Sequence, residues 1–348
     1  MKFLFLEPFF GGSHRDFAQG LVSRSRHRIE LLTLPSRFWK WRMRGAALYF
    51  LNKIPDLNGY DGIITSDLMS LSDFRAIAGP FCPPALVYFH ENQLTYPLAP
   101  GETIDYQFGF TDITTCLAAQ RILFNSRTHF EAFFTALPGF LKMMPEYRPI
   151  WVVDEIRSKS GVLYPGCRFP SAEEDFPAPE SSSPLIVWNH RWEFDKNPGD
   201  FFQAVDAVLD RGLDFQLALL ARESYYAWLK RGTIVVSTAT QENFGISVVE
   251  AIRHGCIPLL PRRLSYPEII PQSFHNDFLY RDQGDLIERL ASLIRDPLRH
   301  RERVKRLSRE MGRYSWERMI GEYDKELRFL GEMKHAGRKE RRGERYET

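Results

Sequence analysis

Two carboxylates and a turn in the second half of the chain give the strongest indication of a functional site. Glu242 lies on a loop after an apolar run, and Glu250 lies in the following helix-like stretch of QENFGISVVEA. Ser247 is placed to cap that helix, and the free N–H groups at its start would hold an anion such as a diphosphate. The alternative, that Ser247 and Glu250 form only a capping box, leaves Glu242 unexplained. We expect Glu242 to bind sugar hydroxyls and Glu250 to reach a ribose.

Two cations follow the first strand-like run of the second half, in NHRWEFDKNP. Arg191 and Lys196 share one strand-to-helix loop, and both could neutralise a diphosphate leaving group. A solvated surface pair is the alternative. We favour the functional interpretation because the loop and the Glu242–Glu250 turn are expected at the same edge of a sheet.

The first half carries weaker signals of the same kind. Gly11 and Gly12 follow the first strand-like run and leave room for a phosphate or a sugar, although a tight turn is the alternative. His90 ends the run ALVYFH and could contact the transferred sugar or an acceptor hydroxyl, although a capped strand end would look the same.

Metal chemistry has no sequence signature here. Asp-x-Asp does not occur, and neither the four cysteines nor the histidines show metal-ligand spacing. We therefore expect Arg191, Lys196 and the helix start to stabilise the leaving diphosphate without a metal or other cofactor. The scattered cysteines fit buried thiols in a reducing compartment, and no apolar run reaches the roughly 18 residues of a spanning helix. We expect a cytoplasmic protein.

The stretch SRFWKWRMR mixes cations with aromatic residues and could bind RNA through phosphates and stacked bases. An amphipathic helix with core aromatics is the alternative. The net charge of only +2 means that such binding must come from a local patch. The candidate RNA-binding residues are Arg37, Trp39, Lys40, Trp41, Arg42 and Arg44.

The elements that must position these residues alternate between strand-like and helix-like runs. This alternation predicts an α/β protein with two doubly wound, Rossmann-like domains facing across a cleft, whose ligands bind at the carboxyl ends of the strands. We expect a first, acceptor-side domain over residues 1–168, a Pro- and Ser-rich linker over 169–184, and a nucleotide-sugar domain over 185–312. A helix over 313–335 and a disordered basic tail over 336–348 complete the prediction.

Together these motifs resemble the retaining glycosyltransferases of family 4, which have the GT-B fold. Within them, the chain is similar to the tRNA-queuosine alpha-mannosyltransferases. The stretches that carry the likeness span most of residues 1–270: FLEPFFGGSH, FWKWRMRGAA, FHENQLTYP, LFNSRTHFEAF, YPG, WNHRWEFDKNP, QENFGISVVEAI and IPLLPRRLSYPEI. The resemblance implies transfer of mannose from GDP-mannose to the queuosine base at the wobble position of a tRNA, with retention at the anomeric carbon.

The resemblance also implies roles for single residues. Gly12 would lie under the diphosphate and His90 beside the mannose, Arg191 and Lys196 would bind the diphosphate, Glu242 the mannose hydroxyls, and Glu250 the ribose. The expected donor-binding set is Gly11, Gly12, Asn243, Phe244, Gly245, Ile246, Ser247 and Glu250. The leaving phosphate itself would act as the base.

The chain departs from the family pattern near residues 221–223. Relatives carry another strand and loop between the run FQLALL and ESYYAWLKRG, in a segment that helps to hold the nucleotide base. Two other functions therefore stay open: a family 4 enzyme with a small or lipid-linked acceptor, and a non-catalytic protein that binds nucleotide or tRNA. The motifs themselves do not fix the donor base, the acceptor atom or the oligomeric state.

Overall fold

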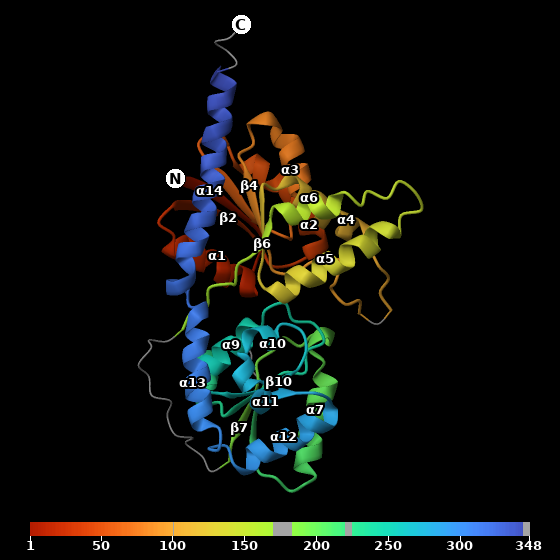
Figure 1. Cartoon of the computed structure of the whole chain (residues 1–348), viewed down its shortest axis with the longest axis vertical. Coiled ribbons are helices and arrows are strands. Elements are labelled where there is room, and N and C mark those ends of the chain that lie inside the picture. The colour runs from red at the N-terminus through yellow and green to blue at the C-terminus, as the bar shows by residue number, and fades with distance from the viewer. Residues whose placement is uncertain (100, 170–182, 220–224, 344–348) are drawn as a thin grey trace. The chain divides into compact units, whose positions relative to one another are not determined.

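The computed structural model describes the whole chain except residues 100, 170–182, 220–224 and 344–348 (Figure 1). Internal contacts divide the chain into two compact units. The first unit is formed by Met1–Gly166 with Trp316–Thr348, and the second by Cys167–Ser315. Each unit has a parallel β-sheet covered by helices, which confirms the predicted fold class.

The sheet of the first unit has the strand order β2-β1-β3-β4-β5-β6, with every neighbouring pair parallel. Short apolar runs between turn residues form these strands, as the sequence predicted. Their bounds are β1 Lys2–Phe10, β2 Arg28–Pro35, β3 Gly62–Ser66, β4 Ala85–Phe89, β5 Arg121–Phe124 and β6 Ser160–Val162.

Helices cover both faces of this sheet. Their bounds are α1 Gly12–Arg24, α2 Trp39–Lys53, α3 Leu71–Ala78, α4 Tyr106–Ala118, α5 Arg127–Lys142, α6 Val152–Ser158 and α14 Trp316–Gly343, with a short 3-10 turn at Gly79–Phe81. Successive side chains of a strand point to opposite faces, so Phe3 and Phe5 pack with α1 and α14, whereas Leu4 and Leu6 pack with α2 to α6. Ser126 caps α5, because its hydroxyl accepts a hydrogen bond from the N–H of His129 at 2.9 Å.

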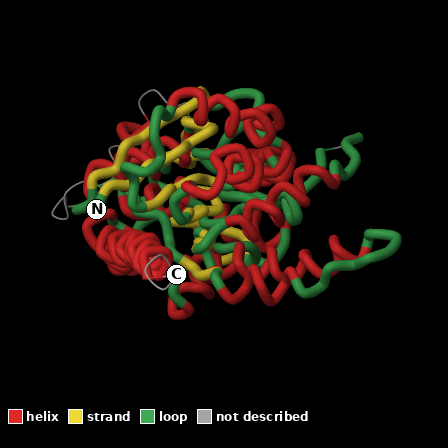
Figure 2. The backbone as a smooth tube through the Cα atoms, turned by 90° about the horizontal axis from the view of Figure 1, so that it is seen from above, coloured by secondary structure: helices red, strands yellow, loops and turns green. Residues whose placement is uncertain are grey.

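The last helix belongs to the first unit, although it follows the second unit in sequence. Trp316, at the start of α14, is only 1% exposed and fills the space left by Gly20 and Gly166. Figure 1 shows α14 beside α1, and Figure 2 shows it along its axis. The helix begins at Trp316 and continues to Gly343, so residues 336–343 are helical, in contrast to the expected disordered tail. Residues 344–348 lie outside the described part.

The second unit has a five-stranded sheet in the order β11-β10-β9-β7-β8. Its strands are β7 Leu185–Trp188, β8 Gln216–Leu219, β9 Ile234–Val236, β10 Ile257–Pro261 and β11 Leu279–Tyr280. Its helices are α7 Pro198–Leu209, α8 Tyr225–Arg231, α9 Ile246–Arg253, α10 Tyr266–Ile269, α11 His275–Phe278, α12 Gln283–Arg295 and α13 Arg301–Met311, with 3-10 turns at Phe194–Lys196, Gln272–Phe274 and Gly312–Tyr314.

Two sequence predictions fall on residues that the structure does not describe. The expected missing segment near 221–223 lies within 220–224, between β8 and α8, and most of the expected linker lies within 170–182. Among the described helices, none has both the length and the apolar character needed to cross a membrane.

Candidate functional site

Lys196 lies at the centre of a buried cluster in the second unit. It ends the 3-10 turn after β7, and its ammonium group donates to the carbonyl oxygen of Gln241 at 2.7 Å. The same nitrogen lies 3.0 Å from Oδ2 of Asp195 and 3.4 Å from Oε2 of Glu242. The loops after β7 and β9 thus meet, which confirms that Lys196 and Glu242 lie together at the carboxyl ends of neighbouring strands.

Both members of the Lys196–Glu242 pair are charged at neutral pH. Burial lowers the pKa of Lys196, but the carboxylates of Glu242 and Asp195 outweigh burial and raise it overall. Burial likewise raises the pKa of Glu242, but the charge of Lys196 contributes most to lowering it overall. The pair therefore offers a permanent cation and a permanent hydrogen-bond acceptor in a site that is largely shielded from water.

Arg191 differs from Lys196 although both lie on the loop after β7. Its side chain is 63% exposed, and its guanidinium group lies 3.2 Å from the carboxylate of Glu193. Its charge also lowers the pKa of Glu242, as a smaller contribution than that of Lys196. The structure thus places one cation in the buried cluster and the other at its exposed side.

The turn before α9 has the form that an anion site needs, but not the cap that the sequence predicted. Gly245 occupies the N-cap position with φ of 91°, a left-handed conformation that favours glycine, and no side chain caps the helix. Ser247 lies inside the helix, so the prediction that it is the cap is wrong. Phe244 is buried against Tyr314, with ring centroids 5.1 Å apart, and this contact anchors the turn.

Glu250 is held by two tyrosines that the sequence analysis did not single out. The hydroxyl of Tyr225 donates to one carboxylate oxygen at 3.0 Å, and that of Tyr226 donates to the other at 3.1 Å. Asn189 joins this network by donating to the hydroxyl of Tyr225 at 3.4 Å, and it also donates to the carbonyl oxygen of Ser247 at 2.7 Å. Glu250, which the sequence predicted to bind a ribose, therefore already has two hydroxyl partners from the start of α8. Tyr225 and Tyr226 directly follow the undescribed residues 220–224, and no sequence pattern links them to Glu250.

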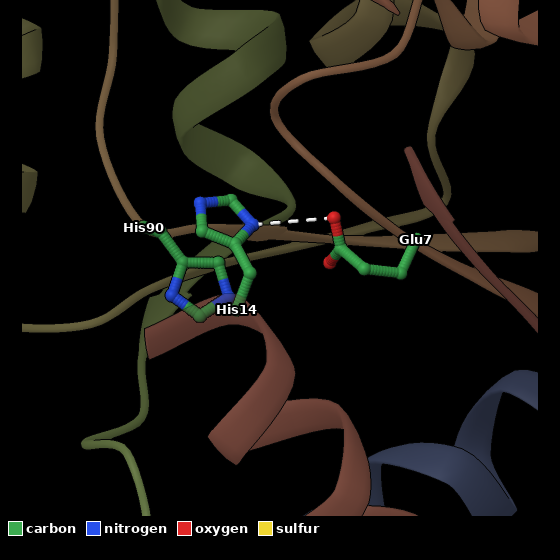
Figure 3. Close-up of side chains that lie close together, drawn as sticks. All are labelled: Glu7, His14 and His90. Carbon is green, nitrogen blue, oxygen red and sulfur yellow. Dashed lines mark hydrogen bonds and ion pairs between the residues drawn. The ribbon is translucent and has the colours of Figure 1, made fainter. Parts of the chain in front are cut away.

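The first unit contains a second buried cluster, where β1 leads into α1 (Figure 3). Glu7 is fully buried, and its Oε1 accepts from the N–H of Phe9 at 2.9 Å and from the hydroxyl of Ser66 at 3.1 Å. Nδ1 of His14 lies 3.3 Å from the same oxygen, and the rings of His14 and His90 have centroids 4.0 Å apart. Glu7 and His14 were missed as site residues. The sequence does contain an indication of both residues: a glutamate in an otherwise apolar strand is expected to have a buried partner, because a buried charge is costly without one.

The charges of this cluster depend on their surroundings. Burial lowers the pKa of His14, but Glu7 first, then Asp67 and Glu91, outweigh burial and raise it to about 9. Burial lowers the pKa of His90 well below its usual range, and the charge of His14 adds to this effect. Burial raises the pKa of Asp67 to about 7. At neutral pH the cluster therefore holds one imidazolium, at His14, and one neutral imidazole, at His90.

The backbone of His90 is fixed from two sides. Oδ1 of Asp67 accepts its N–H at 2.8 Å, and the side-chain amide of Asn125 donates to its carbonyl oxygen at 2.9 Å. Gly11 and Gly12 lie at the start of α1 beside this cluster. A Cβ atom at Gly11 would lie 2.1 Å from the Ser36 hydroxyl, so the turn needs a residue without a side chain. The Gly-Gly turn thus leads into the helix whose His14 ring lies against the ring of His90.

Among the residues that the structure describes, one group of three has the geometry of a metal site. Glu7, His14 and His90 each offer a ligand atom, and these three atoms lie within 4.8 Å of one another. Protonation of His14, which its contact with Glu7 favours, competes with metal binding there. The residues lie far apart in sequence, so a search for ligand spacing did not find them.

The basic and aromatic stretch forms the start of α2 and presents two different faces. Trp39 packs against Phe108, with ring centroids 5.0 Å apart, and Met43 is fully buried beside them. Trp41 is 78% exposed, and Phe38 is 68% exposed. Arg37, Lys40 and Arg44 are exposed as well, although Lys40 lies over the rings of Trp39 and Phe108 and Arg44 donates to the hydroxyl of Thr111 at 3.1 Å. The structure separates the candidate RNA-binding residues into a supporting group, Trp39 with the half-buried Arg42, and an outward group.

Comparison with known proteins places these observations in a family. Residues 2–167 match the family described as tRNA-queuosine alpha-mannosyltransferase N-terminal. The chain is 32% identical over 336 residues to the tRNA-queuosine alpha-mannosyltransferase of Drosophila melanogaster, in a match that covers 84% of this chain and 87% of that protein.

Solved structures with little sequence similarity share the fold. Sucrose-phosphate synthase from Thermosynechococcus elongatus has a TM-score of 0.70 at 12% identity, covering 95% of this chain and 99% of that chain. The catalytic domain of starch synthase IV from Arabidopsis thaliana has a TM-score of 0.67 at 12% identity, with the same coverage of 95% and 99%. These glycosyltransferases have the GT-B fold, and this chain shares it. By its sequence identity over most of both chains, the protein belongs to the tRNA-queuosine alpha-mannosyltransferase family.

Proposed function

We propose that the protein transfers mannose from GDP-mannose to the queuosine base in the anticodon of a tRNA, with retention at the anomeric carbon and without a metal ion. The observation that carries this proposal is the 32% identity to the Drosophila melanogaster enzyme over 84% of the chain. The buried Lys196–Glu242 pair supports it, because a nucleotide-sugar donor brings both an anionic diphosphate and a polyhydroxylated ring.

In this proposal the second unit binds the donor. Lys196 and the more exposed Arg191 neutralise the diphosphate, and the N–H groups at the start of α9, around Gly245, add hydrogen bonds to it. Glu242 accepts hydrogen bonds from the mannose hydroxyls. The contact between Lys196 and Glu242 at 3.4 Å supports this division of roles, since it holds a cation and an acceptor side by side.

The leaving phosphate serves as the base. The acceptor oxygen forms its bond to the anomeric carbon on the face from which the diphosphate departs, and the acceptor proton passes to an oxygen of that phosphate. This step needs no carboxylate nucleophile. It needs a site that stabilises the departing charge, which is the role assigned to Lys196 and Arg191.

The outward face of α2 is the proposed tRNA contact. Arg37, Lys40 and Arg44 would meet phosphates, and Trp41 would stack on an unpaired base. Acidic residues are absent from the sequence between Ser36 and Pro55, so nothing along this helix opposes an anionic partner. A modified tRNA base as acceptor also agrees with a cytoplasmic location, which remains part of the proposal.

A second candidate is a non-catalytic protein that binds nucleotide or tRNA. The specific observation in its favour is the engagement of both carboxylate oxygens of Glu250 by Tyr225 and Tyr226. A ribose that needs Glu250 must displace or share these hydroxyls. This candidate predicts binding of tRNA or nucleotide with no transfer of sugar.

Two measurements on the full chain test the proposal. Thermal unfolding with GDP, GDP-mannose, UDP and UDP-glucose identifies the donor, because a ligand at a hundredfold excess over its dissociation constant stabilises the folded state by about 2.7 kcal/mol. Transfer of radiolabelled mannose to tRNA with queuosine, compared with the same tRNA carrying guanosine, identifies the acceptor.

We expect stabilisation by the guanine nucleotides only, and transfer only to the queuosine tRNA. Lys196→Ala should abolish transfer. Lys325→Ala, which removes a 65% exposed lysine of α14, is the matched control and should leave transfer unchanged. Stabilisation by uracil nucleotides alone would point to a different donor. Binding without transfer would favour the second candidate.

A further inference from the structure

The loop after β7 turns two charged side chains inward and two aromatic rings outward. Asp195 and Lys196 are 1% and 8% exposed, whereas Trp192 and Phe194 are 58% and 42% exposed. The site around Lys196 accounts for the two buried charges. An exposed ring needs no explanation by its exposure alone, but Trp192 is also held in one orientation by its neighbours.

A series of aromatic rings connects Trp192 to the core of the second unit. Trp188 is buried in β7, and its ring centroid lies 4.3 Å from that of Phe201, which in turn lies 5.3 Å from that of Phe202. Phe202 stacks on Trp192, with centroids 6.0 Å apart and 16° between the ring planes. Within the part of the chain that the structure describes, no other aromatic ring contacts Trp192. One face of the exposed indole ring is therefore supported, and the other has no ring against it.

The backbone that carries Trp192 is fixed as well. The carbonyl oxygen of Asp195 accepts from the N–H of Thr240 at 2.8 Å, and Oγ1 of Thr238 donates to the carbonyl oxygen of Lys196 at 3.0 Å. These bonds join the loop after β7 to the loop after β9. A ring on such a support loses little conformational freedom when a ligand binds, which favours binding of a flat group.

The face of the sheet on which Trp192 lies decides which flat group this is. Side chains of β7 alternate between the two faces: Val187 belongs to an apolar cluster with residues of α8 and α9, whereas Trp188 packs against α7. Trp192 stacks on Phe202 of α7, and Glu250 is held by the tyrosines of α8 on the opposite face. With the donor ribose at Glu250, the donor nucleoside lies on the α8 side, and Trp192 is left for a ring of the acceptor.

We propose that Trp192 is a stacking platform for one unpaired base of the tRNA anticodon loop, on the unit that binds the donor. The inference rests on the proposed function, since it takes a tRNA as the acceptor. The loop from Arg191 to Asn197 carries two cations and two carboxylates, and Arg191 lies 3.2 Å from Glu193. The contact is therefore with the plane of a base and needs no phosphate, unlike the contact proposed for α2.

The first test measures tRNA binding to the full-length protein without donor, at several salt concentrations. Trp192→Leu should lower the affinity about tenfold, because stacking on a base is lost. Its dependence on salt should stay that of the wild-type protein, because no phosphate contact is removed. Trp192→Phe keeps a planar ring and should stay within about twofold of the wild-type affinity. Trp151→Leu, at a 64% exposed tryptophan of the first unit, is the matched control and should change nothing.

The second test locates the base with a series of tRNAs that each lack one base of the anticodon loop. One member of the series should bind the wild-type protein about tenfold more weakly than the intact tRNA. The same member should bind Trp192→Leu as well as the intact tRNA does, because the ring that stacked on the missing base is already absent. Equal losses in both proteins for every member of the series would overturn the inference.

Binding of GDP and GDP-mannose, measured by calorimetry, separates a base of the tRNA from a ring of the donor. Both compounds should bind Trp192→Leu as tightly as the wild-type protein. Weaker binding of GDP would assign Trp192 to the guanine, and weaker binding of GDP-mannose alone would assign it to the mannose. Either result overturns the inference, as does an unchanged tRNA affinity in Trp192→Leu.

The proposed function is tested separately by mannose transfer. If the wild-type protein shows the base-dependent binding but no transfer, the stacking platform stands and the catalytic proposal falls. If transfer occurs but tRNA affinity does not respond to Trp192, the catalytic proposal stands and the platform falls. A wild-type protein that binds no tRNA would overturn both.

Discussion

The two units each bury a cation against carboxylates at the carboxyl ends of parallel strands, but they use different cations. In the second unit Lys196 lies among Asp195, Glu242 and the carbonyl of Gln241, and a lysine keeps its charge across the physiological pH range. In the first unit the cation is His14, whose charge exists at neutral pH only because Glu7 and its acidic neighbours raise its pKa. The comparison therefore sets a permanent charge in the second unit against a charge in the first unit that depends on its acidic neighbours.

The largest effect should come from removing the permanent cation. Lys196→Ala leaves Glu242 and Asp195 buried without their partner, and breaking a buried pair in this way costs about 3–5 kcal/mol. We expect that loss in the free energy of opening of β7 and β9, measured by hydrogen exchange, and little change in β1. Lys325→Ala should change neither. Equal losses in both units would mean that they do not behave as separate sites.

The next largest effect is a pH dependence of stability that is expected in the first unit, at His14, and not in the second, at Lys196. A histidine with a raised folded-state pKa stabilises the folded state fully below its unfolded pKa of about 6.5, and loses that contribution as the pH rises through about 9. From pH 7 to 9 the opening free energy of β1 should fall by about 2 kcal/mol more in the wild-type protein than in Glu7→Gln. The opening free energy of β7 should show no such difference between the two proteins. A parallel pH response of β1 in both proteins would contradict a charged His14.

A smaller effect is expected at α2, whose exposed charged residues are basic, in contrast to the acidic cluster inside the first unit. Trp41→Ala should lower tRNA affinity by about 1–2 kcal/mol and leave stability unchanged, because its ring is exposed and could stack on a base. Trp39→Ala should instead lower stability by about 2 kcal/mol, because Trp39 packs against Phe108. Filter binding at two salt concentrations and urea unfolding measure these effects. Phe81→Ala removes a 71% exposed ring outside α2 and is the control.

The smallest effect concerns the network around Glu250. Tyr226→Phe removes one hydrogen bond to the carboxylate, at a cost of about 1 kcal/mol in stability. If the hydroxyl competes with a ribose, GDP should bind about twofold to threefold more tightly by calorimetry. Tyr106→Phe, at a 52% exposed position in the first unit, should change neither quantity. Weaker GDP binding in Tyr226→Phe would place the tyrosine in the nucleotide site itself.

Much of the fold followed from local patterns. The runs FLFLE, ALVYF and LIVW lie in buried strands as predicted, because short apolar runs between turn residues suit parallel sheets covered on both faces. The predicted cap at Ser247 was wrong, because Gly245 adopts a left-handed conformation and begins the helix two residues earlier than the side-chain pattern suggested.

The sites were predictable only in part. Lys196 and Glu242 could be paired in advance, because each follows a predicted strand and such strand ends meet at one edge of a sheet. Contacts that depend on how the elements pack could not be predicted from the sequence. Tyr226 reaches Glu250 only through the placement of α8, and His14 reaches Glu7 only because the chain turns at Gly11 and Gly12.

The sequence by itself determined the fold class, the two parallel sheets, the position of Lys196 and Glu242 at neighbouring strand ends, and the family, since these depend on periodicity and on residues close together in the chain. Only the tertiary structure decided that α14 completes the first unit, that Trp39 faces inward and Trp41 outward, and that Glu7, His14 and His90 form one cluster. The physical reason is that burial, and with it the charge of His14, is set by groups that are distant in sequence and adjacent only after folding.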